Sequence, residues 1–125
     1  MNTMKSDDAR IVVVDDVADT AEVLAMILET AGYEVRTALS GEAALELVAE
    51  FQPLCVLMDI NMPGLGGHEL CQCLRDRYGD DLVLIAVTGA GHVDDRVGAS
   101  FARFDHYLRK PVDIKLLRQL LPPLH

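Results

Sequence analysis

The sequence has no tryptophan, few aromatic residues and no hydrophobic run long enough to cross a bilayer. A membrane-spanning helix needs about 20 consecutive apolar residues, so we do not expect an integral membrane protein. The first residues, Met1 to Asp8, lack the apolar stretch of a signal peptide. These absences predict a soluble, cytoplasmic protein with no membrane partner.

Basic residues are scarce as well. The chain has 11 Lys and Arg against 20 Asp and Glu, which gives a formal net charge of −9 at pH 7. Proteins that bind DNA or RNA neutralise phosphates with basic patches. Direct binding of nucleic acid is therefore not expected.

The three cysteines are too few for a disulfide framework. Cys55 lies within an apolar run, which is typical of a small core residue. Cys71 and Cys73 are two positions apart on an expected helix, so they point to different faces and cannot bind one metal ion together. We expect reduced thiols and no zinc site.

What the chain does contain is enough apolar sequence for one packed domain, with 50% hydrophobic and 25% charged residues in a length of 125. Residues 1–9 are polar and show no periodicity, so they are expected to form a flexible tail. Residues 10–122 are expected to form the domain.

Short apolar runs alternate with helical patterns along this domain. Strands are expected at residues 11–14, 33–38, 54–58, 82–87 and 104–108. Helices are expected at about 19–31, from Ser40 to just before Pro53, at about 67–78 and 92–102, and from Asp113 to just before Pro122. In the first helix, Asp19 or Thr20 is expected to be the cap, and the side chains expected to face the core are Val23, Leu24, Ile27, Leu28 and Ala31.

Alternating strands and helices imply right-handed crossovers and a parallel sheet with helices on both faces. Three strands are fully apolar, which suits the middle of a sheet, and two are mixed, which suits its edges. We predict an α/β fold: a flavodoxin-like (βα)5 three-layer sandwich with a parallel five-stranded sheet of order 2-1-3-4-5.

Chemically active side chains follow four of these strands: Asp15 and Asp16, then Asp59, Thr88 and Lys110. Because parallel strands end at the same edge of a sheet, these groups are expected in one pocket. Two unit charges about 4 Å apart repel by about 4 kcal/mol at an effective dielectric of about 20. Clustered carboxylates therefore favour a bound cation, and oxygen ligands without His or Cys favour Mg²⁺.

A carboxylate nucleophile, Mg²⁺, a lysine and a hydroxyl together are typical of phosphoryl transfer to an aspartate. Asp59 stands alone at the end of a central strand, so we expect it to be the nucleophile, with Asp15 and Asp16 holding the metal. Each feature has a plainer interpretation on its own. The acidic pair can start a helix, Lys110 can be a surface lysine and Tyr107 can be static edge packing.

Four segments in this order resemble the motifs of response regulator receiver domains: Val14-Asp15-Asp16, Met58 to Gly64 with Gly67, Val87-Thr88-Gly89, and Tyr107 to Pro111. The resemblance covers about residues 10–121. It implies a two-component or phosphorelay system in which Asp59 accepts a phosphoryl group from a phosphohistidine. The donor partner would be a sensor histidine kinase or a histidine phosphotransfer protein.

The resemblance also implies roles for the surrounding residues. Mg²⁺ would be held by Asp16, Asp59 and the backbone carbonyl of Asn61, with Asp15 acting largely through water. Thr88 and Lys110 would contact the phosphate, and the Lys110–Pro111 bond matches one that is usually cis in the family. Tyr107 would turn inward as Thr88 moves toward the phosphate.

This movement would switch the face formed by the helix at 92–102, the strand at 104–108 and the last helix. The protein would then be a signalling domain that catalyses only its own phosphorylation and dephosphorylation. Two questions stay open: whether an output partner or domain binds at this face, and whether phosphorylation makes the protein dimerise. The segment from Phe104 to Asp113 also resembles receivers attached to hybrid histidine kinases, whereas Arg103 stands where many relatives have glycine.

Two other functions are kept as alternatives. A phosphohydrolase of the aspartyl-phosphate type would carry a second aspartate two residues after the nucleophile, but that position is Asn61. An interaction module that keeps the fold without phosphorylation would have no need of the complete set of side chains. Nucleotide-binding loops are not indicated, because Asp94 replaces the third glycine after Gly89-Ala90-Gly91.

Overall fold

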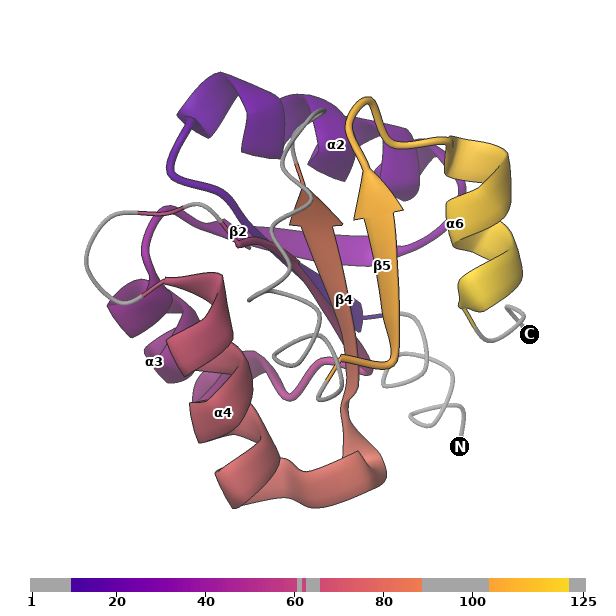
Figure 1. Cartoon of the computed structure of the whole chain (residues 1–125). Helices are drawn as coiled ribbons and strands as arrows, with labels where there is room; N and C mark the ends of the chain where they lie inside the picture. Colours follow the sequence, from indigo (N-terminus) through magenta and orange to yellow (C-terminus); the bar gives the residue numbers. More distant parts are fainter. Residues whose placement is uncertain (1–9, 61, 63–65, 89–103, 122–125) are drawn as a thin grey trace.

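The computed structural model describes residues 10–60, 62, 66–88 and 104–121. Within them, five parallel strands form one sheet of order β2-β1-β3-β4-β5, as predicted (Figure 1). The strands are β1 (Arg10–Val14), β2 (Glu34–Ala38), β3 (Cys55–Asp59), β4 (Val83–Thr88) and β5 (His106–Arg109). The helices are α2 (Ala18–Thr30), α3 (Gly41–Phe51), α4 (Gly67–Tyr78), α6 (Ile114–Leu120) and the short 3-10 helix η1 (Gly79–Asp81).

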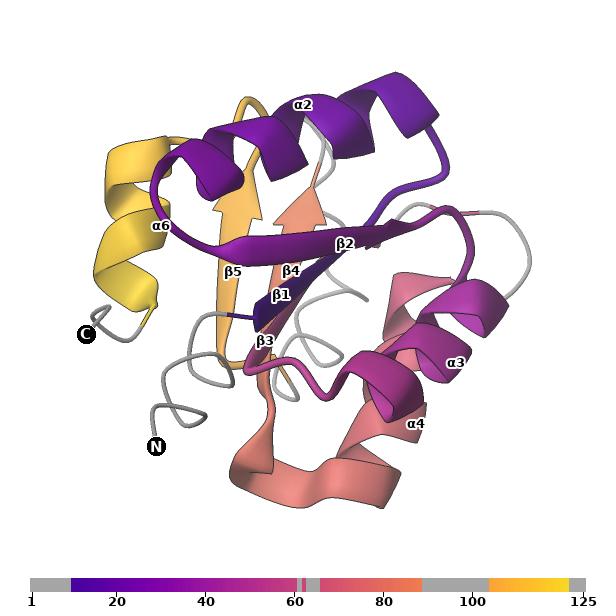
Figure 2. The same cartoon turned by 180° about the vertical axis from the view of Figure 1, so that it is seen from behind.

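The sheet divides the core into two halves. Figures 1 and 2 show α2 and α6 on one face of the sheet and α3 and α4 on the other. Because strand side chains alternate between faces, Ile11 and Val13 pack in the half with α2 and α6, whereas Val12 and Val14 pack in the half with α3 and α4. This arrangement confirms the predicted three-layer α/β sandwich.

The central strands are buried on both sides, as their continuous apolar sequences predict. Every residue of β3 is buried, and so is all of β1 and β4 except the first residue of each. The edge strands β2 and β5 contain both buried and more exposed positions. Cys55 and Cys71 are buried core residues, Cys73 is partly exposed, and all three are free thiols.

Two of the predicted helix caps are confirmed. The Ser40 hydroxyl accepts a hydrogen bond from the Ala43 amide at 3.1 Å, and the Asp113 carboxylate accepts one from the Lys115 amide at 3.0 Å. Each side chain satisfies an amide that has no partner within its helix.

The cap predicted for the first helix is wrong. The helix α2 begins at Ala18, its N-cap is Val17, and Val17 makes no side-chain cap hydrogen bond. Instead, Asp15 Oδ1 accepts a hydrogen bond from the Val17 amide at 2.9 Å. Asp15 thereby closes the turn before α2, so that Asp19 and Thr20 fall inside the helix.

The face that α2 turns to the sheet agrees with the expectation only in part: Leu28 is buried and Leu24 and Ala31 pack against the core, but Val23 and Ile27 do not face it. Ala21, Ala25 and Leu28 are its buried residues, whereas Val23 is 56% and Ile27 39% exposed. Small alanine side chains let a helix approach a sheet closely, and a helix can bury only one stripe of its surface in this way. The larger Val23 and Ile27 side chains are therefore left beside the contact.

The fifth strand starts two residues later than predicted, at His106. The backbone amide of Asp105 donates to the Leu84 carbonyl at 2.8 Å, and the Leu84 amide donates to Asp105 Oδ2, also at 2.8 Å. A side-chain oxygen thus takes the place of a backbone acceptor at the start of the β4–β5 pair.

Arg75 of α4 holds this junction together. Its Nη2 lies 2.6 Å from Asp105 Oδ2, and its Nη1 donates to the carbonyls of Gly79 and Leu82 at 2.8 Å. The end of α4, the entry to β4 and the entry to β5 are therefore joined by one guanidinium group, whose planar fork suits several acceptors at once.

The helix expected at residues 92–102, together with Gly98 and Arg103, lies outside the described residues. No helix in the described ranges is both long and apolar enough to cross a membrane.

Candidate functional site

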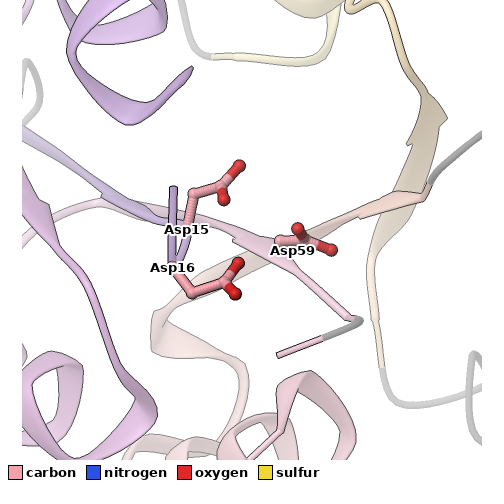
Figure 3. Close-up of side chains that lie close together, drawn as sticks. All are labelled: Asp15, Asp16 and Asp59. Atoms are coloured by element: carbon pink, nitrogen blue, oxygen red, sulfur yellow. The ribbon is translucent and has the colours of Figure 1, made fainter. Parts of the chain in front are cut away.

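Three aspartates meet where the central strands end. Asp15 and Asp16 follow β1, and Asp59 is the last residue of β3 (Figure 3). Oxygen atoms of the three carboxylates all lie within 4.8 Å of one another. The adjacent parallel strands β1 and β3 deliver them to the same edge, which is where open α/β sheets bind ligands.

Burial makes these charges interact strongly. Asp15 is 4% and Asp59 6% exposed, whereas Asp16 is exposed to solvent. Water screens charge less inside a protein than at its surface. The two buried carboxylates therefore need a positive partner nearby.

Lys110, which follows β5, supplies that partner. Its Nζ lies 3.1 Å from Asp59 Oδ2 and 3.4 Å from Asp15 Oδ2. The Lys110 amide donates to the Thr88 carbonyl at 2.8 Å, which fixes the backbone beside β4. The Lys110–Pro111 peptide bond is cis, as expected.

The ionisation of Lys110 follows from its surroundings. Partial burial lowers the pKa of the ammonium group, but the hydrogen bond and charge of Asp59, together with those of Asp15, outweigh it and raise the pKa above its ordinary value. Lys110 is thus positively charged at neutral pH. With one positive charge against three carboxylates, the cluster has a formal net charge of −2.

The donor set fits a hard divalent cation. All three clustered side chains offer oxygen, and no His or Cys joins them among the described residues. Oxygen-only sites with open positions suit Mg²⁺. Asn61, whose backbone carbonyl was expected to be a further ligand, lies outside the described residues.

Strand alternation places Thr88 and Tyr107 on the sheet face of α3 and α4, whereas Asp59 pairs with Val87, which packs in the half with α2 and α6. Thr88 is 6% exposed, and no hydrogen bond joins its hydroxyl to Asp59 or Lys110 within the described residues. In β4, Leu84 and Ala86 pack in the half with α3 and α4, so the alternation of the strand places Thr88 on that face too. Tyr107 pairs with Ala86 across the sheet and is 63% exposed.

A cavity of about 420 Å³ adjoins the acidic cluster. Asp15, Asp59 and Lys110 line one part of it, and Val23 and Ile27 of α2 line another. This cavity could not be predicted from the sequence, because it depends on which face α2 buries. The same holds for the junction of Arg75 with Asp105, since it joins residues 30 positions apart.

Comparison with known proteins defines the class. The family model described as "Response regulator receiver domain" matches residues 11–122. The chain belongs to this family, and it is a signalling domain of the two-component type.

Curated relatives include "Response regulator MprA" of Mycolicibacterium vanbaalenii, which is 41% identical over 108 residues; the match covers 86% of this chain and 46% of that protein. The protein of the same name in Mycobacterium leprae is 40% identical over 108 residues, covering 86% of this chain and 47% of that protein. The chain therefore spans about half the length of the curated relatives it matches.

Solved structures share the fold closely. The response regulator TrrA of Thermotoga maritima, determined in complex with Mg(2+)-BeF, superposes with a TM-score of 0.79 at 32% identity, covering 89% of this chain and 94% of that one. A receiver domain from Clostridium thermocellum gives a TM-score of 0.79 at 31% identity, covering 87% of each chain. These similarities confirm the flavodoxin-like fold expected from the sequence.

Proposed function

We propose that Asp59 accepts a phosphoryl group from a phosphohistidine of a sensor histidine kinase or a histidine phosphotransfer protein. The observation that carries the proposal is the close approach of three carboxylates, two of them buried, with Lys110 bonded to Asp59 and Asp15. The cluster lies at the edge of the sheet where the parallel strands end, which is where open α/β sheets bind ligands.

In the proposed reaction, a carboxylate oxygen of Asp59 forms a new P–O bond as the P–N bond to the donor histidine breaks. The electron pair of the broken bond stays on the imidazole, which takes a proton from solvent. Lys110, already 3.1 Å from Asp59 Oδ2, is placed to stabilise negative charge on the phosphoryl oxygens.

Mg²⁺, held by Asp16, Asp59 and the Asn61 carbonyl with Asp15 acting through water, would neutralise phosphoryl oxygens when bound. The oxygen-only cluster supports this assignment. Lys110 bonds to both Asp15 and Asp59 and so holds the Asp59 carboxylate in place.

We further propose that phosphorylation changes the face made by residues 92–102, β5 and α6. Phosphorylation replaces the single negative charge of the Asp59 carboxylate with an acyl phosphate that carries up to about −2, and the added charge and acceptor oxygens would draw in the Thr88 hydroxyl and let Tyr107 turn inward. The shared sheet face of Thr88 and Tyr107 and the 63% exposure of Tyr107 support this pairing. An output partner or a second copy of the chain would bind there.

The domain bounds are also part of the proposal. We place the receiver domain at residues 10–122 and treat residues 1–9 as a tail. The start of β1 at Arg10 and the match of the family model to residues 11–122 support these bounds.

The test is incubation with a small phosphodonor such as acetyl phosphate, with and without Mg²⁺, followed by intact-mass measurement. The wild-type protein is expected to gain one phosphoryl group only with Mg²⁺, and Asp59→Asn to gain none. Asp80→Asn, the same change at an exposed residue of η1, serves as control and should behave like wild type. A mass gain in Asp59→Asn would refute the assignment.

The metal ligands have their own test. Mg²⁺ at about 100 times its dissociation constant should add about 2.7 kcal/mol to the free energy of unfolding, measured by urea denaturation. Asp16→Asn should lose most of that gain, and Asp80→Asn should keep it. Equal stabilisation of both variants would place the ion elsewhere.

A phosphohydrolase would give a different result when the same proteins are incubated with a phosphate ester. Asp59-dependent turnover of a generic phosphate ester, far beyond one equivalent, would favour that reaction over a phosphoacceptor role. We expect none, because Asn61 stands where such an enzyme needs a second aspartate.

A further inference from the structure

We infer that the outer edge of β2 is a docking site for a basic peptide, which binds in an extended conformation and adds a further strand to the sheet. β2 is the outermost strand on its side of the sheet, and β1 is its only strand neighbour among the residues that the structure describes (Figure 2). Such an edge presents backbone groups that can pair with another chain. The inference does not depend on phosphoryl transfer to Asp59.

The outward backbone groups of β2 follow from its pairing with β1. The Ala38 carbonyl accepts a hydrogen bond from the Asp15 amide at 3.1 Å, so the backbone groups of Ala38 face β1. The register of the two strands is continuous over the whole of β2, and the backbone groups of successive strand residues alternate in direction. The amides and carbonyls of Val35 and Thr37 therefore point away from β1.

A surface groove of about 500 Å³ lies along this edge. Val35, Arg36 and Thr37 line the groove from β2, and Met26 of α2 and Leu47 of α3 line it from the neighbouring helices. Met26 is 63% exposed. A peptide in the groove thus pairs with the backbone of β2 and also covers apolar surface, which is favourable.

The charges along α2 select a basic peptide. Glu22 and Glu29 line the groove on either side of Met26 and are exposed. No ion pair joins either glutamate to another residue within the described part of the chain. Arg36 also lines the groove, but its guanidinium group lies over the Phe51 ring, 4.5 Å from the centroid. Two unpaired carboxylates therefore attract cationic side chains of a partner.

The spacing along α2 defines the sequence pattern of the peptide. Glu22 and Glu29 are about two turns apart, or about 10 Å along the helix axis. Residues i and i+4 of a strand are about 13 Å apart and point to the same face, and the flexible stem of lysine accommodates the difference. The matching pattern is therefore lysine at i and i+4 with an apolar residue at i+2, which lies over Met26.

The probe for the experiment is a capped peptide of sequence Thr-Lys-Thr-Val-Thr-Lys-Thr, and its control has glutamate in place of both lysines. The full chain is titrated with each peptide at low salt, and binding is followed by amide NMR shifts. Saturable shifts are expected at Met26, Val35 and Thr37 with the lysine peptide and not with the control. Equal binding of the two peptides would overturn the inference.

Hydrogen exchange tests whether the peptide pairs with the strand. The Val35 and Thr37 amides should exchange more slowly at saturating peptide, because they become hydrogen-bonded only in the complex. Shifts without slower exchange of these two amides would show contact without strand addition and would overturn the inference.

Two variants at one position of β2 test the edge itself. Thr37→Pro removes the outward amide, and proline is tolerated at a sheet edge whose amide faces solvent. This variant should bind the lysine peptide about tenfold or more weakly, whereas Thr37→Val keeps the amide and should bind as wild type does. Circular dichroism and urea denaturation check that both variants are folded. Unchanged binding by a folded Thr37→Pro protein would overturn the site.

Matched charge variants test the selection by α2. Glu22→Gln and Glu29→Gln should each weaken binding about two- to fivefold, as for exposed ion pairs. Glu42→Gln is the control, because Glu42 is exposed in the first turn of α3 and lies outside the groove. Equal effects of all three variants would show a general charge effect and overturn the site.

A second copy of the chain is the competing occupant of this edge. Pairing of β2 with its own copy would place the acidic stretch of α2 beside the same stretch of the second copy, where like charges repel. Sedimentation of the chain without peptide is therefore expected to show no association through β2. A dimer that Thr37→Pro dissociates and Thr37→Val does not would assign the edge to self-association and overturn the inference.

Discussion

Tyr33 is a buried phenol at the end of α2, next to the edge strand β2. It is 6% exposed, and burial raises its pKa above the ordinary value of 10.0, while the positive charge of Arg118 opposes this shift in part. Because the folded state holds the phenol proton more tightly than the unfolded state, the folded state loses relative stability as the pH rises past the unfolded pKa.

Tyr33 is expected to affect the stability of the protein in the alkaline pH range. The free energy of unfolding contributed by this group is fully present below about pH 10 and falls as the pH rises toward the folded pKa. Tyr33→Phe should therefore lose less stability than wild type between about pH 9 and about pH 11, as measured by urea denaturation. Parallel losses in both proteins would show that Tyr33 is not responsible.

Single residues at the strand ends were the most predictable part of the site. Asp15, Asp59 and Lys110 converge as expected because parallel strands end at one edge, a consequence of topology alone. The bond from the Val17 amide to Asp15 could not be predicted, since it depends on how the chain turns after β1.

Two side chains stabilise the start of the β4–β5 pair: Asp105, which precedes β5, and Arg75 of α4. Asp105 accepts the Leu84 amide and pairs with Arg75 of α4. Asp105→Ala should leave the Leu84 amide without its acceptor and lower the free energy of unfolding by about 1–3 kcal/mol. Asp80→Ala, at an exposed residue of η1, should change it by no more than about 0.5 kcal/mol.

Hydrogen exchange would locate the effect. In Asp105→Ala, the amides of β5 should exchange faster, while those of β1 and β3 keep the protection of the global unfolding equilibrium. A uniform increase across the sheet would instead mean that the junction stabilises the whole domain and not the edge strand in particular.

Helix and strand order followed from the sequence, but the packing of α2 did not. Apolar spacing identifies a helix reliably, yet it ranks Val23 and Ile27 above alanine as core residues. The structure buries Ala21 and Ala25 instead, because closeness to the sheet matters more than side-chain size there. Similarly, β5 starts at His106 because the Asp105 side chain replaces a backbone acceptor.

The rate at which the cysteines are alkylated reports the unfolding of the whole domain. Cys55 is fully buried in β3, and burial raises the pKa of its thiol well above the usual value, so it is a poor nucleophile when folded. Cys73 on α4 is partly exposed. With an alkylating reagent at neutral pH, Cys73 should react first, and Cys55 only as the whole domain unfolds.

Peptide mapping after increasing urea would check this order. Modification of Cys55 should rise through the same transition as the circular dichroism signal. Modification of Cys55 at the rate of Cys73 in the absence of urea would contradict the prediction and indicate local opening of the central strands.

The division of the core by the sheet has a consequence for how the protein can diverge from its relatives. Asp15, Asp59 and Lys110 line the cavity together with residues of α2 and α6, whereas the alternation of strand side chains places Thr88 and Tyr107 on the sheet face of α3 and α4. Substitutions on α2 therefore alter what approaches Asp59 without touching the surroundings of Tyr107. The sequence of α2 can thus change without altering the face of β4 and β5 that carries Thr88 and Tyr107.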